Sequence, residues 1–357
     1  MGIRNKTPNP ILQNDLEQLA KTFPFAAELK NSSILITGAT GLVGSALTRA
    51  LAVISEKHAL NIKIYALVRN IEKANATLGD LLRSGSVVPI QADVTQPINL
   101  DDHVDHIFHT ASVTASKTFV TQPVETLLTA IVGTQNLLEF ARKKNIKSMV
   151  YLSSMEVYGI TDPDLYPIRE ADLGYIDILS VRSSYSEGKR TCECLCSAYA
   201  AEYGVPVKIA RLAQTFGAGV SPEDNRAFAQ FAKACLTGKD IVLHTRGDSV
   251  GNYCYTTDAV GGLLTILLHG ATAQAYTVVN ERTTMPIRDV AQLVSDTLTG
   301  GKTKIVFDIP DNALTYGYAP DVTMRLSADK LRALGWEPVV ELPEMFRRLA
   351  AGFQAFS

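Results

Sequence analysis

A tyrosine and a lysine stand four positions apart in the segment SYSEGK, at Tyr185 and Lys189. Residues at this spacing share one face of an α-helix. An ammonium group beside a phenol stabilises the phenolate and lowers the tyrosine pKa from about 10 toward neutrality. The pair therefore predicts proton transfer to and from a substrate hydroxyl, with Tyr185 as the acid and base and Lys189 as the group that tunes it.

A second reactive segment, LSSMEVYG over 152–159, follows a run of apolar residues that predicts a β-strand. The carboxyl ends of parallel strands form the edge at which open α/β sheets bind ligands. A hydroxyl at this edge, that of Ser154, can hold the reacting oxygen of a substrate. Glu156 is either a catalytic base toward a neighbouring C–H group or a polar residue paired with a helix N-terminus. Both interpretations stay open at this point.

Glycines recur every third residue in ITGATGLVG, directly after a predicted strand and before a predicted helix. Such glycines permit a tight turn, let a pyrophosphate approach the backbone and allow close helix packing. The alternative is a glycine-rich turn without a ligand, but the position after the first strand of a series favours a dinucleotide. The predicted cofactor contacts of this segment are Gly38, Thr40, Gly41, Leu42, Val43 and Gly44.

The ends of the second and third predicted strands indicate which dinucleotide binds. Arg69 stands where an acidic residue would accept from a ribose 2′-hydroxyl, and a guanidinium instead favours a 2′-phosphate. The sequence therefore favours NADP, with NAD and a solvent-exposed Arg69 as the alternative, and Asn70 is the neighbouring candidate. Asp93, which precedes Val94, either accepts a hydrogen bond from an adenine amino group or caps a loop.

The elements that must position these residues alternate along the chain between apolar strands and longer helical patterns. Strands are expected at 34–36, 62–68, 87–92, 105–109, 148–153 and 205–210. Helices are expected between them, and the two longest cover 123–144 and 184–203. This alternation predicts right-handed βαβ units and a doubly wound α/β fold with a parallel, Rossmann-type sheet.

The same pattern divides the chain into three parts. An N-terminal helical arm is expected over 1–30, with an amphipathic pattern over 10–29 and a helix end near the break at Pro24. A cofactor-binding Rossmann domain is expected over 31–215 and about 252–282. A smaller, interleaved C-terminal α/β substrate lobe takes 216–251 and 283–357. The chain is expected to return to the main sheet near 254–268.

Composition excludes several classes of protein. With 357 residues, 46% of them hydrophobic, and a net charge of −2, the chain resembles neither disordered nor collagen-like sequences and lacks the positive charge of a nucleic-acid binder. It has no signal-like N-terminus and no run of the roughly 18 apolar residues that a membrane span needs. A cytoplasmic protein with no membrane partner is expected.

The metal-binding residue types do not form a metal-binding pattern. Five cysteines include Cys192, Cys194 and Cys196, whose helical spacing suits neither a disulfide nor a tetrahedral metal site. We expect reduced, buried, structural thiols. The histidines lack a clustered carboxylate partner and an HExxH pattern, so no metal is expected.

Together with the stretches HTAS over 109–112, RLAQTFG over 211–217 and YCYTTD over 253–258, these motifs resemble the extended short-chain dehydrogenase/reductase family, in its NAD-dependent epimerase/dehydratase branch. The resemblance covers roughly 31–350. It implies that Tyr185 is the acid and base, that Lys189 holds the nicotinamide ribose and that Ser154 bonds the reacting oxygen. It also implies contacts to cofactor and substrate from His109, Thr110, Ala111 and Ser112.

The usual substrate implied by this resemblance is a nucleoside-diphosphate sugar that is oxidised at carbon 4. Three departures narrow the expectation. The residue before Glu156, typically an acid in 4,6-dehydratases, is Met155, which donates no proton. Gln214 replaces a common asparagine, and Gly251 replaces an arginine that clamps the diphosphate. The candidates to replace that clamp are Arg226 and Arg246.

Four functions are compatible with these features. The first is a nucleotide-sugar epimerase, and the second is an NADPH-dependent reductase of a nucleotide-linked keto sugar, which Arg69 and Met155 favour. A dehydratase or decarboxylase that uses Glu156 is a minor alternative. A non-catalytic cofactor-binding protein is least favoured, because Ser154, Tyr185 and Lys189 are all present. A homodimer that pairs the helices 123–144 and 184–203 is implied by the resemblance alone.

Overall fold

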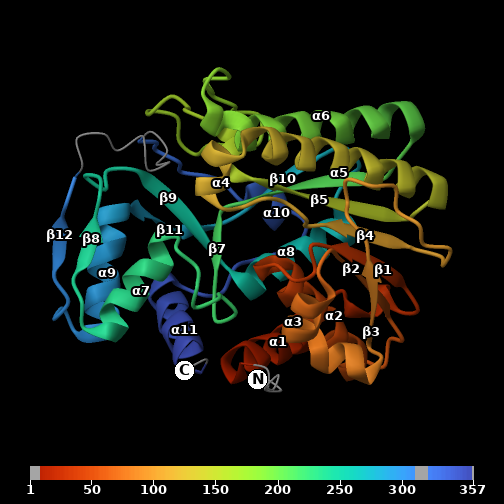
Figure 1. Ribbon diagram of the computed structural model, residues 1–357, viewed down its shortest axis with the longest axis horizontal. Helices are drawn as coiled ribbons and strands as arrows, with labels where there is room; N and C mark the ends of the chain where they lie inside the picture. Colours follow the sequence, from red (N-terminus) through yellow and green to blue (C-terminus); the bar gives the residue numbers. More distant parts are fainter. Residues whose placement is uncertain (1–8, 310–320, 356–357) are drawn as a thin grey trace.

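The computed structural model describes residues 9–309 and 321–355. Seven parallel strands form its main sheet in the spatial order β10-β6-β5-β4-β1-β2-β3 (Figure 1). The strands are β1 (Ser33–Thr37), β2 (Lys63–Val68), β3 (Val87–Gln91), β4 (His106–His109), β5 (Ser148–Ser154), β6 (Val207–Leu212) and β10 (Ala275–Val278). The first strand is central and the series runs outward on both sides, so the predicted doubly wound fold is confirmed.

Helices cover both faces of this sheet (Figure 1). On one face lie α1 (Pro10–Thr22), α2 (Leu42–Lys57), α3 (Ile71–Ser84) and α8 (Thr256–His269). On the other lie α5 (Pro123–Lys144) and α6 (Ser184–Tyr203), with the short α4 (Ser116–Thr121) beside them. Because both faces are covered, strands such as β1 are buried along their whole length, which explains their unbroken apolar sequence.

A second lobe contains two small sheets and its own core. One sheet has the order β11-β9-β7, and the other pairs β12 with β8. The strands are β7 (Gln214–Phe216), β8 (Ile241–Leu243), β9 (Val250–Tyr255), β11 (Asn280–Pro286) and β12 (Ile305–Phe307). The helices are α7 (Ala227–Thr237), α9 (Ile287–Thr299) and α11 (Leu342–Ala355), and the short α10 (Asp329–Arg332) lies against β10. Phe216, Phe228 and Phe346 pack together in this core.

The structure corrects one expectation about the elements and refines another. The chain was expected to return to the main sheet near 254–268. Strand β9, which ends at Tyr255, instead pairs with β7 and β11 in the second lobe, and the later strand β10 pairs with β6 of the main sheet. An apolar strand fits either sheet, and its hydrogen-bonding partner decides which. The N-terminal helix ends at Thr22, next to the expected break at Pro24, and the last residues of the expected range form a separate 3₁₀ turn, η1 (Ala26–Leu29). The domain boundaries stay a prediction.

All five cysteines are unpaired, and four of them are buried. Cys194 is exposed on α6, so the expectation of a buried thiol is wrong there, because Cys194 faces away from the side of the helix that buries Cys192 and Cys196.

In the described ranges no helix is long and apolar enough to cross a membrane. Those ranges also contain no group of three metal-binding side chains able to hold an ion.

Candidate active site and cofactor site

The glycine loop joins β1 to α2 at the carboxyl edge of the main sheet. Gly38 has a left-handed φ of 65°, and a Cβ there would lie 2.7 Å from the Ala111 nitrogen. A Cβ on Gly44 would lie 2.3 Å from the Gly38 oxygen, so only glycine permits this contact. The first turn of α2 has no acidic residue and no capping side chain. These features fit a dinucleotide pyrophosphate at the helix N-terminus.

The other predicted residues of this loop are distributed between backbone and packing roles. Thr40 lies in the turn, and Leu42 and Val43 open α2. The side chain of Leu42 packs toward the second lobe, and that of Val43 packs toward the main core. Both side chains are only partly buried, and their contact with a cofactor stays a prediction.

Strand β4 ends beside the loop in a network of hydroxyl groups. His109 is buried, and its two ring nitrogens lie 2.8 Å from the Thr37 hydroxyl and 3.3 Å from the Thr134 hydroxyl. The Thr110 hydroxyl donates to the Thr37 carbonyl at 2.6 Å, and the Ala111 nitrogen donates to the Thr37 hydroxyl at 3.2 Å. Burial lowers the pKa of His109 to about 3, so the ring is neutral and helps to fix the shape of this edge.

The residues expected at the cofactor ribose and base have structural partners. Asn70 caps α3 by accepting from the Lys73 nitrogen at 2.8 Å. Asp93 accepts from the nitrogen and hydroxyl of Thr95, which is the loop-capping alternative, and these bonds lower its pKa. Arg69 is exposed over 73% of its side chain and lies 3.9 Å from Asp93.

Val94 is buried, and its carbonyl accepts from the amide of Asn136 at 2.9 Å. This bond ties the end of the third strand to α5. Since Arg69 is exposed and only loosely paired with Asp93, it is free to meet either a 2′-hydroxyl or a 2′-phosphate.

The proposed proton-transfer residues meet where β5 ends and α6 begins. Ser154 ends β5 and caps the 3₁₀ turn η2 (Met155–Tyr158). The Lys189 ammonium is buried, donates to the Leu152 carbonyl at 2.7 Å and lies 5.9 Å from the centre of the Tyr185 ring. The structure therefore brings Ser154, Tyr185 and Lys189 to one edge of the sheet, as expected from the sequence.

The charges around Tyr185 differ from the sequence-based expectation. The pKa of Tyr185 is raised to about 12, chiefly by burial and also by the Glu156 carboxylate, while Ser154 and Arg182 act in the opposite direction. Burial also lowers the pKa of Lys189 to about 8. The predicted lowering of the Tyr185 pKa by Lys189 is therefore wrong for this state of the protein, because desolvation of the phenolate outweighs the favourable charges.

Two residues of this site were missed from the sequence. The Phe119 ring stacks on the Tyr185 ring, with centroids 4.3 Å apart and planes 9° apart. Arg182, in the 3₁₀ turn η3 (Val181–Ser183), forms a two-pronged ion pair with Glu156 at 2.8 and 3.1 Å. Glu156 is thus paired with a side chain rather than with a helix N-terminus. Phe119 reaches the site from a distant position in the chain, and Arg182, although it is three residues before Tyr185, pairs with Glu156 26 residues away, so no local motif marks either contact.

The predicted substrate residues lie on several elements. Ser112 follows β4 and donates to the Val113 carbonyl, and Gln214 opens β7. Arg226 precedes α7, pairs with Asp224 at 2.6 Å and lies near enough to Tyr185 to lower its pKa. Arg246 is exposed in the loop after β8. The structure thus links Arg226 to the site by its charge and gives no such link for Arg246.

Gly251 stands on β9 opposite Met285, and a Cβ there would meet open space. The strand would therefore tolerate the arginine that the family commonly has at this position. Its absence leaves Arg182 and Arg226 as the guanidinium groups whose charges reach Tyr185.

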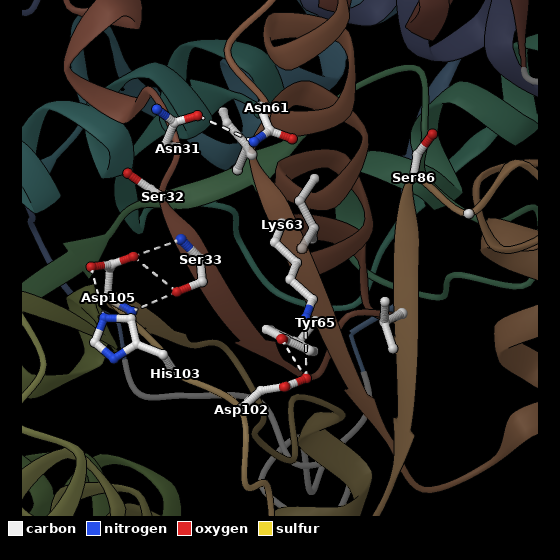
Figure 2. Close-up of a pocket in the computed structure, with 14 residues that line it drawn as sticks. Asn31, Ser32, Ser33, Asn61, Lys63, Tyr65, Ser86, Asp102, His103 and Asp105 are labelled. Carbon is white, nitrogen blue, oxygen red and sulfur yellow. Dashed lines mark hydrogen bonds and ion pairs between the residues drawn. The ribbon is translucent and has the colours of Figure 1, made fainter.

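A polar cavity of about 540 Å³ lies at the opposite, amino edge of the sheet (Figure 2). We call it the amino-edge groove, and the side chains that define it are Ser33, Lys63, Tyr65, Asp102, His103 and Asp105. Asp102 accepts from Tyr65 at 2.7 Å and from Lys63 at 3.2 Å. Asp105 accepts from the nitrogen and hydroxyl of Ser33. These groups bind one another at the edge away from Tyr185.

A model of the NAD dependent epimerase/dehydratase family matches residues 34–280. The chain belongs to this family. It is 31% identical over 324 residues to UDP-glucuronic acid decarboxylase 1 of Danio rerio, and the aligned residues make up 90% of this chain and 72% of that protein. It is 29% identical over 345 residues to UDP-glucuronic acid decarboxylase 5 of Arabidopsis thaliana, and the aligned residues make up 93% of this chain and 94% of that protein. The protein is thus an enzyme of a family that modifies nucleotide sugars and uses NAD.

Solved structures confirm the fold. UDP-glucose 4-epimerase from Thermotoga maritima, with UDP-glucose, has a TM-score of 0.74 at 21% identity and covers 91% of this chain and 99% of that chain. UDP-glucuronic acid 4-epimerase from Bacillus cereus, with UDP-glucuronic acid and NAD, has a TM-score of 0.75 at 20% identity and covers 91% and 100%. At these identities the likeness establishes the shared Rossmann architecture.

Proposed function

We propose that the protein decarboxylates a nucleotide-linked hexuronic acid, with UDP-glucuronic acid as the first candidate, and releases CO₂ and a UDP-pentose. The observation that supports this most is the segment Met155-Glu156 beside Tyr185, together with the relatives named UDP-glucuronic acid decarboxylase. Dehydration needs an acid that protonates a departing 6-hydroxyl, and Met155 supplies none. A hexuronic acid has a carboxylate at carbon 6, so no such acid is needed.

The chemistry requires few groups from the protein. A ketone at carbon 4 stands β to the carboxylate, and loss of CO₂ leaves an electron pair on carbon 5 that the ketone delocalises. Tyr185 removes the proton from the 4-hydroxyl in the first half of the cycle and returns it in the second. Ser154 donates to the same oxygen. The proton that carbon 5 takes up when CO₂ has left comes from solvent, and the Glu156 carboxylate would orient the water molecule that delivers it.

We propose NAD as the cofactor, because the matching family model is named for NAD and the Bacillus cereus structure with the same fold is described with NAD. The cycle ends with the cofactor in the state in which it began. When bound, it supplies oxidation at carbon 4 and the matching reduction after CO₂ has left. Gly38, Gly41 and Gly44 would hold its pyrophosphate, and Lys189 its nicotinamide ribose. The preference for NADP that Arg69 suggested stays a sequence prediction. The relatives favour decarboxylation over the plain epimerisation expected first, although both reactions use Tyr185 in the same way.

Substrate recognition and assembly are proposed from the same elements. Ser112, Gln214 and Arg226 are proposed to contact the sugar and the diphosphate, with Arg246 as the more distant candidate. A homodimer is proposed through α5 and α6, which lie side by side (Figure 1) and expose Val124 and Leu128. Sedimentation equilibrium of the wild type and of Leu128→Glu tests this, because a dimer through α5 would dissociate in the variant. The cytoplasmic location stays a prediction.

The function is tested with purified protein, whose bound cofactor is identified by mass spectrometry after denaturation. UDP-glucuronic acid labelled in its carboxyl group is added without free cofactor. Release of labelled CO₂ with a UDP-pentose, seen by NMR, supports decarboxylation. Formation of UDP-galacturonic acid alone would replace it with epimerisation. A requirement for added NADPH would replace it with net reduction, and no turnover of uronic acids with turnover of neutral UDP-sugars would exclude it.

A further inference from the structure

Arg182 and Glu156 form an ion pair whose two charges both act on Tyr185. Nη1 of Arg182 lies 2.8 Å from one Glu156 oxygen, and Nη2 lies 3.1 Å from the other. The two side chains are exposed over 17% and 27% of their surface. The pairing therefore fixes both the position and the plane of the carboxylate, which a single lysine ammonium would not do.

The guanidinium also takes part in a stack that reaches Tyr185. Its carbon lies 5.3 Å from the centre of the Phe119 ring, and Phe119 in turn stacks on Tyr185. Phe119 is exposed over only 2% of its surface, so its ring has little room to move. Arg182 is thus joined to Glu156 by hydrogen bonds and to Tyr185 through one aromatic ring.

The Nε–H of Arg182 is buried and has no hydrogen-bond partner among the described residues. An unpaired buried donor on a charged group costs free energy, so stability alone does not favour this arrangement. The charges explain what it achieves. Glu156 raises the pKa of Tyr185 and Arg182 lowers it, so the guanidinium partly cancels the penalty that the carboxylate imposes on the phenolate.

We propose that Arg182 is a positioning residue: it holds the Glu156 carboxylate in one orientation beside the reacting sugar carbons and offsets its charge at Tyr185. This inference rests on the proposed function, since it concerns the carboxylate that is proposed to direct the protonation of carbon 5. It explains how a carboxylate and a phenol that must lose its proton can share one site. An exposed ion pair would not have this effect, because solvent screens it and leaves it mobile.

A double-mutant cycle tests the positioning role. Arg182→Gln is expected to lower kcat for CO₂ release by about 10- to 100-fold, the range of a misplaced catalytic group, with KM changed less than about threefold. Adding Arg182→Gln to Glu156→Gln should lower kcat by less than about threefold more, because the residue to be positioned is already lost. If the two losses multiply, Arg182 acts independently of Glu156 and the proposal is wrong.

Two further variants separate positioning from folding. Arg182→Lys keeps the charge without the two-pronged geometry and should recover only part of the rate. Arg182→Ala should regain activity when millimolar guanidinium ion is added, whereas the same concentration of sodium or urea should have no effect. The matched control is Arg347→Gln, which breaks an exposed ion pair with Glu344 and should leave kcat unchanged. Failure of guanidinium to restore any activity in a folded Arg182→Ala protein would count against the proposal.

The pH profile gives a readout that a structural role would not change. The rise of kcat/KM with pH that reports ionisation of Tyr185 should move to higher pH in Arg182→Gln and to lower pH in Glu156→Gln. An unmoved profile in Arg182→Gln would overturn the proposal. If the wild-type protein releases no CO₂ from any uronic acid, it is the proposed function that fails. The ionisation of Tyr185 is then followed by NMR of ring-labelled tyrosine, with Tyr185→Phe to assign the signal.

Discussion

The two edges of the main sheet carry similar residue types in opposite arrangements. At the amino edge, Asp105 is bonded to Ser33 and lies 2.9 Å from Lys147. At the carboxyl edge, Ser154 accepts one bond, from the Glu156 nitrogen, and Tyr185 is held through its ring by Phe119. The amino edge thus uses its polar groups to join strands, whereas the groups of the carboxyl edge are the ones that we propose to contact a ligand.

The two histidines of β4 show the same difference over one short strand. His109, at the carboxyl end, has a hydroxyl beside each ring nitrogen. His106, at the amino end, has a buried Nδ1 without a partner among the described residues. Burial lowers the pKa of His106 to about 4, so its imidazole is neutral in the folded protein. Both rings are buried and neutral, but only His109 has hydroxyl groups beside both of its nitrogens.

The largest effect is expected from Tyr185→Phe at the carboxyl edge. Loss of the phenol should lower kcat by a factor of about 10² or more, the usual effect of removing a general acid and base. The phenyl ring keeps its stacking on Phe119, so the melting temperature should change little. Steady-state kinetics and thermal unfolding measure the two quantities. A variant with the wild-type rate would show that Tyr185 is not the acid and base.

The next largest effect concerns pH and His106. The unfolded histidine titrates near 6.5 and the folded one near 4, so the unfolded state binds more protons between these values and stability falls as pH drops through this window. The expected loss is up to about 3 kcal/mol, from 1.36 kcal/mol per pKa unit. Chemical unfolding at pH 7 and pH 4 measures it, and His106→Gln should reduce the difference. An unchanged pH dependence would mean that His106 does not contribute. His109 contributes with the same sign and is present in both proteins.

A smaller effect is expected from Asp105→Asn, which should destabilise the fold by about 2 kcal/mol, because a buried charged acceptor of Ser33 and Lys147 is lost. Its folded pKa is lowered, so its contribution is present above the ordinary carboxyl value and is lost as pH falls below it. Urea unfolding at pH 7 and pH 3 should therefore show a smaller cost at pH 3. A large fall in kcat of the folded variant would contradict the separation of the two edges.

The smallest effect is expected from Arg69→Ala. NADP(H) should bind about tenfold more weakly, which corresponds to the loss of one charge-assisted contact of about 1.4 kcal/mol. NAD(H) should bind within about threefold of wild type, because Asp93 already partly offsets the charge of Arg69. Calorimetry with both cofactors measures the ratio. Equal weakening of both would show that Arg69 does not distinguish them.

Much of the site could be predicted because it depends on local spacing. Tyr185 and Lys189 meet through one helical turn, and the glycines act within one loop. Arg182 and Phe119 could not be predicted in the same way, since Arg182 is 26 residues from Glu156 and Phe119 comes from the short helix α4, before α5. The raised pKa of Tyr185 was missed for a related reason, because spacing shows which charges are near but not how much water is excluded.

The sequence by itself determined the order of strands and helices in the main sheet, the glycine loop after the first strand and the helical spacing that joins Tyr185 to Lys189. Periodicity and short motifs encode these features, and both act over a few residues. Only the tertiary structure decided that β9 joins the second lobe, that Arg182 holds Glu156, and that the polar residues of the amino edge bind one another. Those outcomes depend on contacts between segments that are distant in the sequence. Such contacts form because a buried polar group without a hydrogen-bond partner costs free energy.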